Sequence, residues 1–180
     1  MSRRPTPKDK RWMQYVRRRG FDTERMLVRE LRKRGIMAYR IPASGMWESR
    51  RRLSLPDVLA ISPRAVYGFQ VKATGAGRFE FKPRDLAPLA DFVRDARLFN
   101  LSCLGFAVVR FVTGNGSYWA GVRVEPSDIV RREFRDPQNP KRIRYKFSFA
   151  SKEIAEKYVL NTAQHGYSLT KLLHRLGVIK

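Results

Sequence analysis

Four polar residues stand in segments that are otherwise apolar, and together they have the composition of a hydrolytic metal site. Glu24 precedes Leu27, Val28 and Leu31 by three, four and seven residues, so a helix would place its carboxylate on their apolar face. A carboxylate in that position is costly unless a partner or a metal compensates its charge. The other interpretation of Glu24 is an ordinary acidic residue in the first turn of a helix.

The remaining three residues lie in the stretch PDVLAISPRAVYGFQVKAT, at positions 56–74, which predicts two strands joined by a turn. Asp57 opens the first strand, a place where turn chemistry alone can explain it. Gln70 and Lys72 are two residues apart on the second strand, so their side chains share one face. A buried lysine is rare without a partner, although an edge strand with one solvated face would also tolerate it.

One arrangement accounts for all four residues. Carboxylate and amide oxygens bind a hard cation such as Mg²⁺, which activates a bound water for attack. A lysine beside it stabilises the negative charge that develops on a phosphate in the transition state. The residues therefore predict a catalytic metal site of Glu24, Asp57, Gln70 and Lys72.

The charge of the chain indicates an anionic partner. The 180 residues contain 38 Lys and Arg against 16 Asp and Glu, a net charge of +22. Such an excess favours nucleic acid as the partner. No apolar run is long enough to span a bilayer and the N-terminus has no apolar signal region, so we expect no membrane association. The single cysteine, Cys103, excludes an intrachain disulfide, and with these features it favours an intracellular, cytoplasmic protein associated with the nucleoid.

The elements that must position these residues follow from the hydrophobic pattern. Residues 1–19 are expected to form a basic N-terminal arm, and residues 20–125 a core that begins with a helix capped by Asp22 and ended by Gly35. Three strands, a short strand at 79–81, a helix over 83–100 and two further strands follow. This order predicts an α/β fold with a mixed central sheet flanked by helices. Residues 126–180 are expected to be a small C-terminal extension packed on the core, in which a basic loop leads into one strand and two short helices.

The motif PD, followed after a dozen residues by QVK, resembles the PD-(D/E)xK nuclease superfamily, and with it the restriction-endonuclease-like fold. The ordered set GFDTERMLVRELRKRG, YRIPASG, LPDVLA and FQVKAT, followed by a basic helix and FAVVRF, is similar to the archaeal Holliday-junction resolvases. The resemblance covers residues 20–124. It implies an Mg²⁺-dependent endodeoxyribonuclease, with Mn²⁺ as a substitute and no small-molecule cofactor. It further implies a homodimer that cuts opposed strands of a four-way junction symmetrically, in recombination and repair of branched double-stranded DNA.

The resemblance also assigns individual positions. Glu24, Asp57 and Gln70 match the metal-site acids, Lys72 matches the conserved motif lysine of the family, and Ser44 matches a serine near the scissile phosphate. The positions expected to contact DNA are basic: Arg25 and Arg40 match the family, and the arginine-rich loop adds Arg50, Arg51 and Arg52. Two further basic stretches, residues 3–19 and 131–146, are candidates for phosphate contacts.

The chain departs from the family pattern in three places. The family's glutamate is Gln70 here, which brings an oxygen but no charge and so weakens the hold on a metal. The loop between Ser44 and Asp57 is longer than usual, and the segment after residue 125 has no counterpart. A competing ExK motif, Glu80 to Lys82, lies in the short strand that follows, and Glu80 could lend a carboxylate if that strand folded back toward Asp57.

Two other functions remain open from the sequence. One is a restriction- or repair-type nuclease with the same fold. The other is a non-catalytic nucleic-acid-binding protein with a degenerate site, which the composition alone would favour. Polar residues placed on otherwise apolar elements favour the nucleases, because a binding protein gains nothing from Glu24 and Lys72 in those positions.

Overall fold

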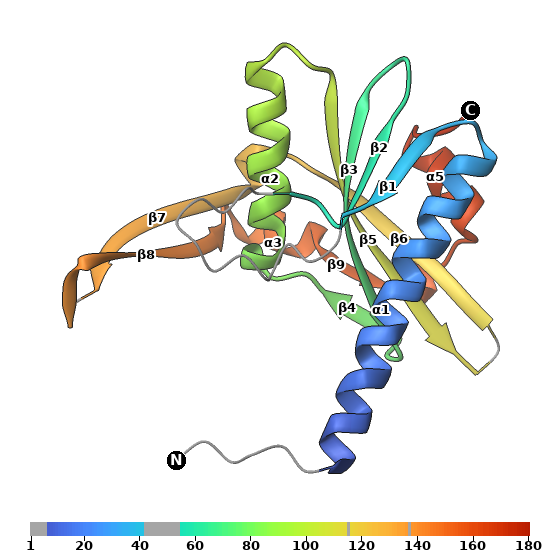
Figure 1. Ribbon diagram of the computed structural model, residues 1–180, viewed down its shortest axis with the longest axis horizontal. Coiled ribbons are helices and arrows are strands. Elements are labelled where there is room, and N and C mark those ends of the chain that lie inside the picture. The colour runs from blue at the N-terminus through green and yellow to red at the C-terminus, as the bar shows by residue number, and fades with distance from the viewer. Residues whose placement is uncertain (1–6, 42–54, 115, 137) are drawn as a thin grey trace.

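The computed structural model describes residues 7–41, 55–114, 116–136 and 138–180 (Figure 1). Its centre is a five-stranded sheet in the order β1-β2-β3-β5-β6. The strands are β1 (Met37–Arg40), β2 (Val58–Ile61), β3 (Val66–Thr74), β5 (Cys103–Thr113) and β6 (Gly116–Val124). The predicted mixed α/β sheet flanked by helices is confirmed.

Strand direction follows from the connections. β1, β2 and β3 form an antiparallel meander, whereas β3 and β5 are parallel and are joined by the crossover helix α2 (Pro83–Leu98). β6 returns antiparallel to β5. A parallel pair requires such a crossover, which explains why a helical pattern separates two strongly apolar strands in the sequence.

The two faces of the sheet are covered by different helices. One face packs Phe69, Val71 and Val108 beneath α1 (Pro7–Lys33), whose Leu27 and Leu31 are fully buried. The opposite face packs against α2, in a second cluster that includes Ala107 and Val109 of β5 and Leu89 of α2. The alternation of side chains along β3 and β5 therefore supplies both cores.

Two glycines allow α2 to lie close to the sheet. A Cβ at Gly68 of β3 would approach a methyl carbon of Leu89 to 2.8 Å, and one at Gly105 of β5 would approach a methyl carbon of Val93 to 2.8 Å. A larger residue at either position would push the helix away. The parallel register places these two glycines side by side.

Helix α1 corrects one prediction. It begins at Pro7 rather than at Asp22, so Asp22 is not an N-cap and the expected boundary at residue 19 falls inside the helix. Thr23 fits this continuous helix because its hydroxyl donates to the Arg19 carbonyl at 2.8 Å, one turn earlier. The end of the helix agrees with expectation, since Gly35 has a φ of 73°, the left-handed conformation typical after a helix.

The C-terminal segment contains more regular structure than the sequence predicted. The expected basic loop is strand β7 (Ile129–Asp136), which pairs with β8 (Asn139–Phe149) as an antiparallel hairpin. The predicted strand is therefore confirmed in β8, whereas the strand before it was missed. Helix η1 (Pro126–Asp128) leads into this hairpin.

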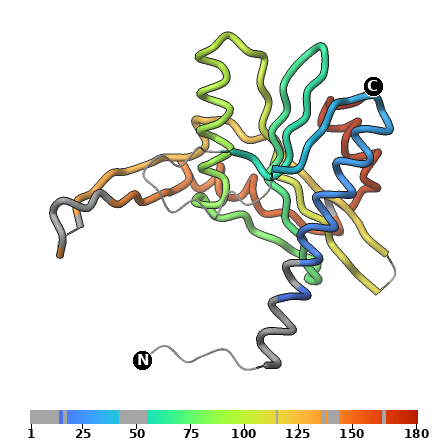
Figure 2. Tube along the Cα trace, viewed as in Figure 1, coloured from blue at the N-terminus to red at the C-terminus, as the bar shows by residue number. Residues whose placement is uncertain are grey.

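The chain then returns to the core. The remaining elements are short: α3 (Lys152–Lys157), β9 (Val159–Asn161), α4 (Thr162–His165) and α5 (Leu169–Arg175). β9 pairs with β4 (Arg78–Glu80), and Leu172 and Leu173 of α5 are buried in the cluster beneath α1. Figure 2 traces this return path, in which the end of the chain lies beside the first helix. Within the described residues, no helix has the length and apolar character required to cross a membrane.

Candidate active site

Asp57 and Gln70 meet at the end of the β2–β3 pair. The paired register ends with Val58 opposite Phe69, so Asp57 lies one step beyond it, opposite Gln70. The Asp57 Oδ2 atom accepts a hydrogen bond from Gln70 Nε2 at 2.5 Å and another from the Val71 backbone N–H at 2.8 Å. Gln70 is 7% exposed whereas Asp57 is only partly buried, so the contact is shielded from water mainly on the Gln70 side.

The environment of Asp57 disfavours its negative charge. Burial raises the pKa of its carboxyl group from 3.8 to about 6, and the nearby Glu24 carboxylate acts in the same direction. The Val71 N–H and the charges of Lys72 and Arg40 oppose the rise without cancelling it. Asp57 is therefore a partly buried carboxylate whose charge these protein groups compensate only in part.

Glu24 and Lys72 both act on Asp57 through their charges, and Gln70 donates a hydrogen bond to it, so all four predicted residues lie close to Asp57. Lys72 follows Gln70 on the same face of β3 and is partly buried. The Glu24 carboxylate forms an ion pair with Arg40, at the end of β1, and both side chains are mostly buried. Arg40 also lies over the Phe21 ring, with its guanidinium carbon 4.3 Å from the ring centroid.

The residues predicted to contact DNA are only partly described. Arg25 is exposed on α1 and lies 3.7 Å from the Asp22 carboxylate, a position open to a ligand. Arg40 is held by Glu24 instead, so in this arrangement it orients the acid. Ser44 and the arginine-rich loop, with Arg50, Arg51 and Arg52, lie outside the described residues.

The competing motif lies elsewhere in the fold. Glu80 is exposed on β4, which pairs with β9 in a separate two-stranded sheet, whereas Asp57 immediately precedes β2, an interior strand of the central sheet. Lys82, the third residue of that motif, immediately precedes α2. The ExK pattern at this position is thus part of the strand-to-helix connection.

The oxygen atoms of Asp57 and Gln70 are donors that suit a hard cation, although together they bring little negative charge. Among the described residues, no group of three His, Cys, Asp or Glu side chains comes together, and Gln70 brings an amide rather than a carboxylate. The partly uncompensated charge of Asp57 favours a cation beside it. Within the described part of the chain, the Asp57 Oδ1 and Gln70 Oε1 atoms accept no hydrogen bond, so neither oxygen is held by a protein donor.

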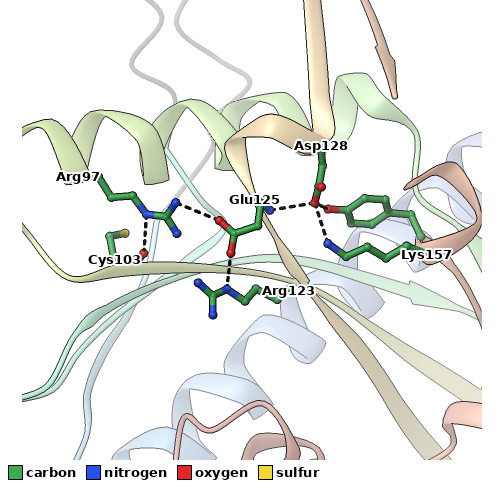
Figure 3. Close-up of polar contacts among 7 residues, drawn as sticks. Arg97, Cys103, Arg123, Glu125, Asp128 and Lys157 are labelled. Atoms are coloured by element: carbon green, nitrogen blue, oxygen red, sulfur yellow. Dashed lines mark hydrogen bonds and ion pairs between the residues drawn. The ribbon is translucent and has the colours of Figure 1, made fainter. Parts of the chain in front are cut away.

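A second buried acid was not anticipated. Asp128, at the end of η1, accepts hydrogen bonds from the Glu125 backbone N–H at 3.0 Å, from Lys157 Nζ at 2.8 Å and from the Tyr158 hydroxyl. Burial raises its pKa, but these bonds outweigh that effect and hold the pKa below its usual value. Beside it, Glu125 bridges Arg97 of α2 and Arg123 of β6, with oxygen–nitrogen separations of 3.0 and 2.5 Å (Figure 3). The only sequence signal was the fragment EPSD, which fits the capping box that is formed here.

The comparisons with known proteins cover the segment that contains this site. Residues 15–100 match the family model of the archaeal Holliday junction resolvases (Hjc). This segment carries that family's pattern. It contains Glu24, Asp57, Gln70 and Lys72, and the resemblance that the motifs indicated over residues 20–124 is confirmed for residues 20–100.

A solved structure is also similar. The Holliday junction resolvase Hjc from the archaeal hyperthermophile Archaeoglobus fulgidus has 19% identity, with 84% of this chain and 96% of that chain covered and a TM-score of 0.45. The comparison with curated proteins found no matching relative. The family match supports a structure-selective, junction-resolving nuclease.

Proposed function

We propose that this protein is a metal-dependent endonuclease that resolves four-way DNA junctions by paired, symmetric phosphodiester hydrolysis as a homodimer. The observation that carries the proposal is the Asp57–Gln70 contact inside the segment that matches the resolvase family. Its buried carboxylate and amide, with Lys72 on the same strand face, form the composition expected of a nuclease site. The net charge of +22 fits a DNA substrate, and we assign the protein to the cell interior, at the nucleoid.

Asp57, Gln70 and Glu24 would hold the metal, Mg²⁺ or Mn²⁺, which when bound supplies an activated water and a positive charge beside the phosphate. Asp57 offers its Oδ1 atom while Oδ2 stays fixed by the Val71 N–H. Glu24 is oriented by Arg40, which limits its rotation. Lys72 contributes a positive charge to the phosphate that is attacked.

A second candidate is a non-catalytic junction-binding protein. The observation that favours it is that Gln70 presents its amide nitrogen to Asp57, an arrangement that satisfies the acid without any metal. An active site requires the amide oxygen to turn toward the cation, at the cost of that hydrogen bond. The two candidates therefore differ in what Gln70 does when metal is added.

A cleavage assay with a matched pair of variants separates them. The wild type, Gln70→Glu and Asp57→Asn are incubated with a labelled four-way junction over a series of Mg²⁺ and Mn²⁺ concentrations. The proposal predicts cutting by the wild type at high metal concentration, cutting by Gln70→Glu at lower concentration, and none by Asp57→Asn. A wild type that binds but leaves the junction intact at saturating metal, while Gln70→Glu cuts it, identifies the non-catalytic protein.

A further inference from the structure

The hairpin of β7 and β8 is a separate two-stranded sheet that projects from the body of the protein (Figure 1, at the left). It lies outside residues 15–100, so the family match does not account for it. A lone two-stranded ribbon buries little surface and is marginally stable in water without a further layer. Beyond its base, the hairpin therefore offers two long exposed faces.

The base of the hairpin is fixed firmly to the core. Ile129 and Phe149 face each other in the register and both pack on the cluster beneath α2. The Phe149 ring stacks on Tyr158, with centroids 5.1 Å apart, and the Ala150 N–H donates to the Asp128 carbonyl at 3.0 Å. The direction of the hairpin is thus set by the same Asp128 network that Figure 3 shows at the end of β6.

The two faces of the hairpin differ in charge. Residues opposite each other in an antiparallel pair share a face, so the register assigns every side chain. One face, here called the mixed face, carries Arg131, Glu133, Arg135 and Tyr145. It turns toward α2, because Arg131 lies 3.9 Å from the Asp91 carboxylate and stacks over the Tyr145 ring at 3.7 Å.

The opposite face, here called the cationic face, carries Arg132 opposite Lys146 and Phe134 opposite Arg144. All four side chains are exposed. Among the described side chains of this face from Val130 to Phe134, and their partners on β8, none carries a carboxylate. Like charges directly opposite each other destabilise a strand pair. Folding alone therefore does not favour Arg132 opposite Lys146, whereas an anionic ligand would.

We propose that the cationic face of the β7–β8 hairpin binds the phosphate backbone of one duplex arm of the DNA, away from the cleavage site. A two-stranded ribbon is narrow enough to lie along a duplex groove, and Arg132 and Lys146 then neutralise phosphates while Phe134 makes apolar contact with the groove wall. The identity of the ligand as junction DNA rests on the proposed function; the choice of this face rests on the register alone.

The test measures binding of a fluorescent four-way junction by anisotropy, without divalent metal, at salt concentrations from 50 to 200 mM. The Arg132→Gln/Lys146→Gln variant removes two cations from the cationic face. We expect the slope of log K against log salt to fall by about 2, since each phosphate contact contributes about 0.9, and affinity to fall roughly tenfold. Arg135→Gln, on the mixed face of the same hairpin, is the matched control for the single variant Arg132→Gln. The control should bind DNA like the wild type.

Thermal unfolding provides a second measurement. Removal of the Arg132–Lys146 repulsion should leave the melting temperature unchanged or higher, so lost DNA binding cannot be assigned to lost folding. Equal effects of Arg132→Gln and Arg135→Gln, or an unchanged salt slope in the double variant, overturn the proposal. Unchanged DNA binding with lost binding to vesicles of anionic phospholipid would assign the face to a membrane surface, and also overturns it.

The failure of this inference is distinguishable from failure of the proposed function. A wild type that binds but never cuts junctions, with the reduced salt slope still seen in the double variant, leaves the hairpin inference standing and removes the catalytic one. Normal junction cutting with an unchanged salt slope in the double variant does the reverse.

Discussion

Replacement of Asp57 by asparagine should stabilise the metal-free protein while it abolishes cleavage. The oxygen of asparagine can accept the hydrogen bonds from Gln70 and Val71 in place of Oδ2, and its amide nitrogen takes the position of Oδ1, which accepts none within the described residues. The substitution therefore keeps the shape of the site and removes only the buried charge. Residues that serve catalysis often cost stability in this way.

The magnitude follows from the pKa of Asp57. Its rise from 3.8 to about 6 means that the native state binds the proton more tightly than the unfolded state. Each pKa unit corresponds to about 1.4 kcal/mol, so ionisation costs the native state about 3 kcal/mol. Below about pH 4 the group is protonated in both states and the cost is absent. Stability of the wild type is lost as the pH rises through the window from about 4 to 6, and the loss is complete above it.

Urea unfolding in EDTA, from pH 3.5 to 8, measures this difference. Below pH 4, we expect the difference in free energy of unfolding between the wild type and Asp57→Asn to be constant. Above pH 6, this difference should have shifted by about 3 kcal/mol in favour of the variant. Asp95→Asn, at an exposed position on α2, is the matched control and should differ from the wild type by no more than about 0.5 kcal/mol at any pH. A pH-independent difference, or a variant less stable above pH 6, would refute the buried-charge description of the site.

Three further predictions concern neighbouring groups. Gln70→Glu places a second carboxylate against Asp57, so the metal-free protein should lose about 2 kcal/mol of stability at pH 8. Its affinity for Mg²⁺, measured by calorimetry, should rise at least tenfold. Equal stability of the variant and the wild type at pH 8 would contradict the contact between residues 57 and 70. Lys72→Met should lower single-turnover cleavage roughly 10²–10³-fold with junction binding changed less than about threefold, and parallel losses in both would place the lysine in binding instead. Asp128→Ala leaves Tyr158 and Lys157 without their acceptor and should cost about 3 kcal/mol at pH 7, measured by urea unfolding; this cost should shrink as the pH falls below about 4, because the lowered pKa means that the stabilisation is lost on protonation.

The sequence predicted the core of the fold because its local signals agree with its tertiary contacts. Strand β3 and strand β5 are long apolar runs, and the helical spacing between them requires a crossover, so the parallel pair followed. The strand β7 was missed because RREFRD lacks apolar alternation. Its residue that packs in the apolar core is Ile129 at its base; beyond that, the strand depends mainly on pairing with β8, which no local pattern reveals.

The sequence indicated which residues make up the candidate site, but not which side chains they contact. Spacing and family pattern singled out Glu24, Asp57, Gln70 and Lys72, since each interrupts an apolar element. Spacing could not reveal that Arg40 would pair with Glu24, or that Gln70 would direct its amide nitrogen to Asp57. Both contacts depend on how the ends of β1, β2 and β3 come together, which only the assembled sheet determines.

The most direct test of the account is a map of cut positions on all four strands of a labelled junction with Mg²⁺, beside a linear duplex of the same sequence. The account predicts paired cuts at symmetric positions near the branch point on two opposed strands, with the linear duplex left intact and Asp57→Asn inactive on both. Equal cutting of the linear duplex, or cuts unpaired between opposed strands, would contradict junction resolution as the function of this protein.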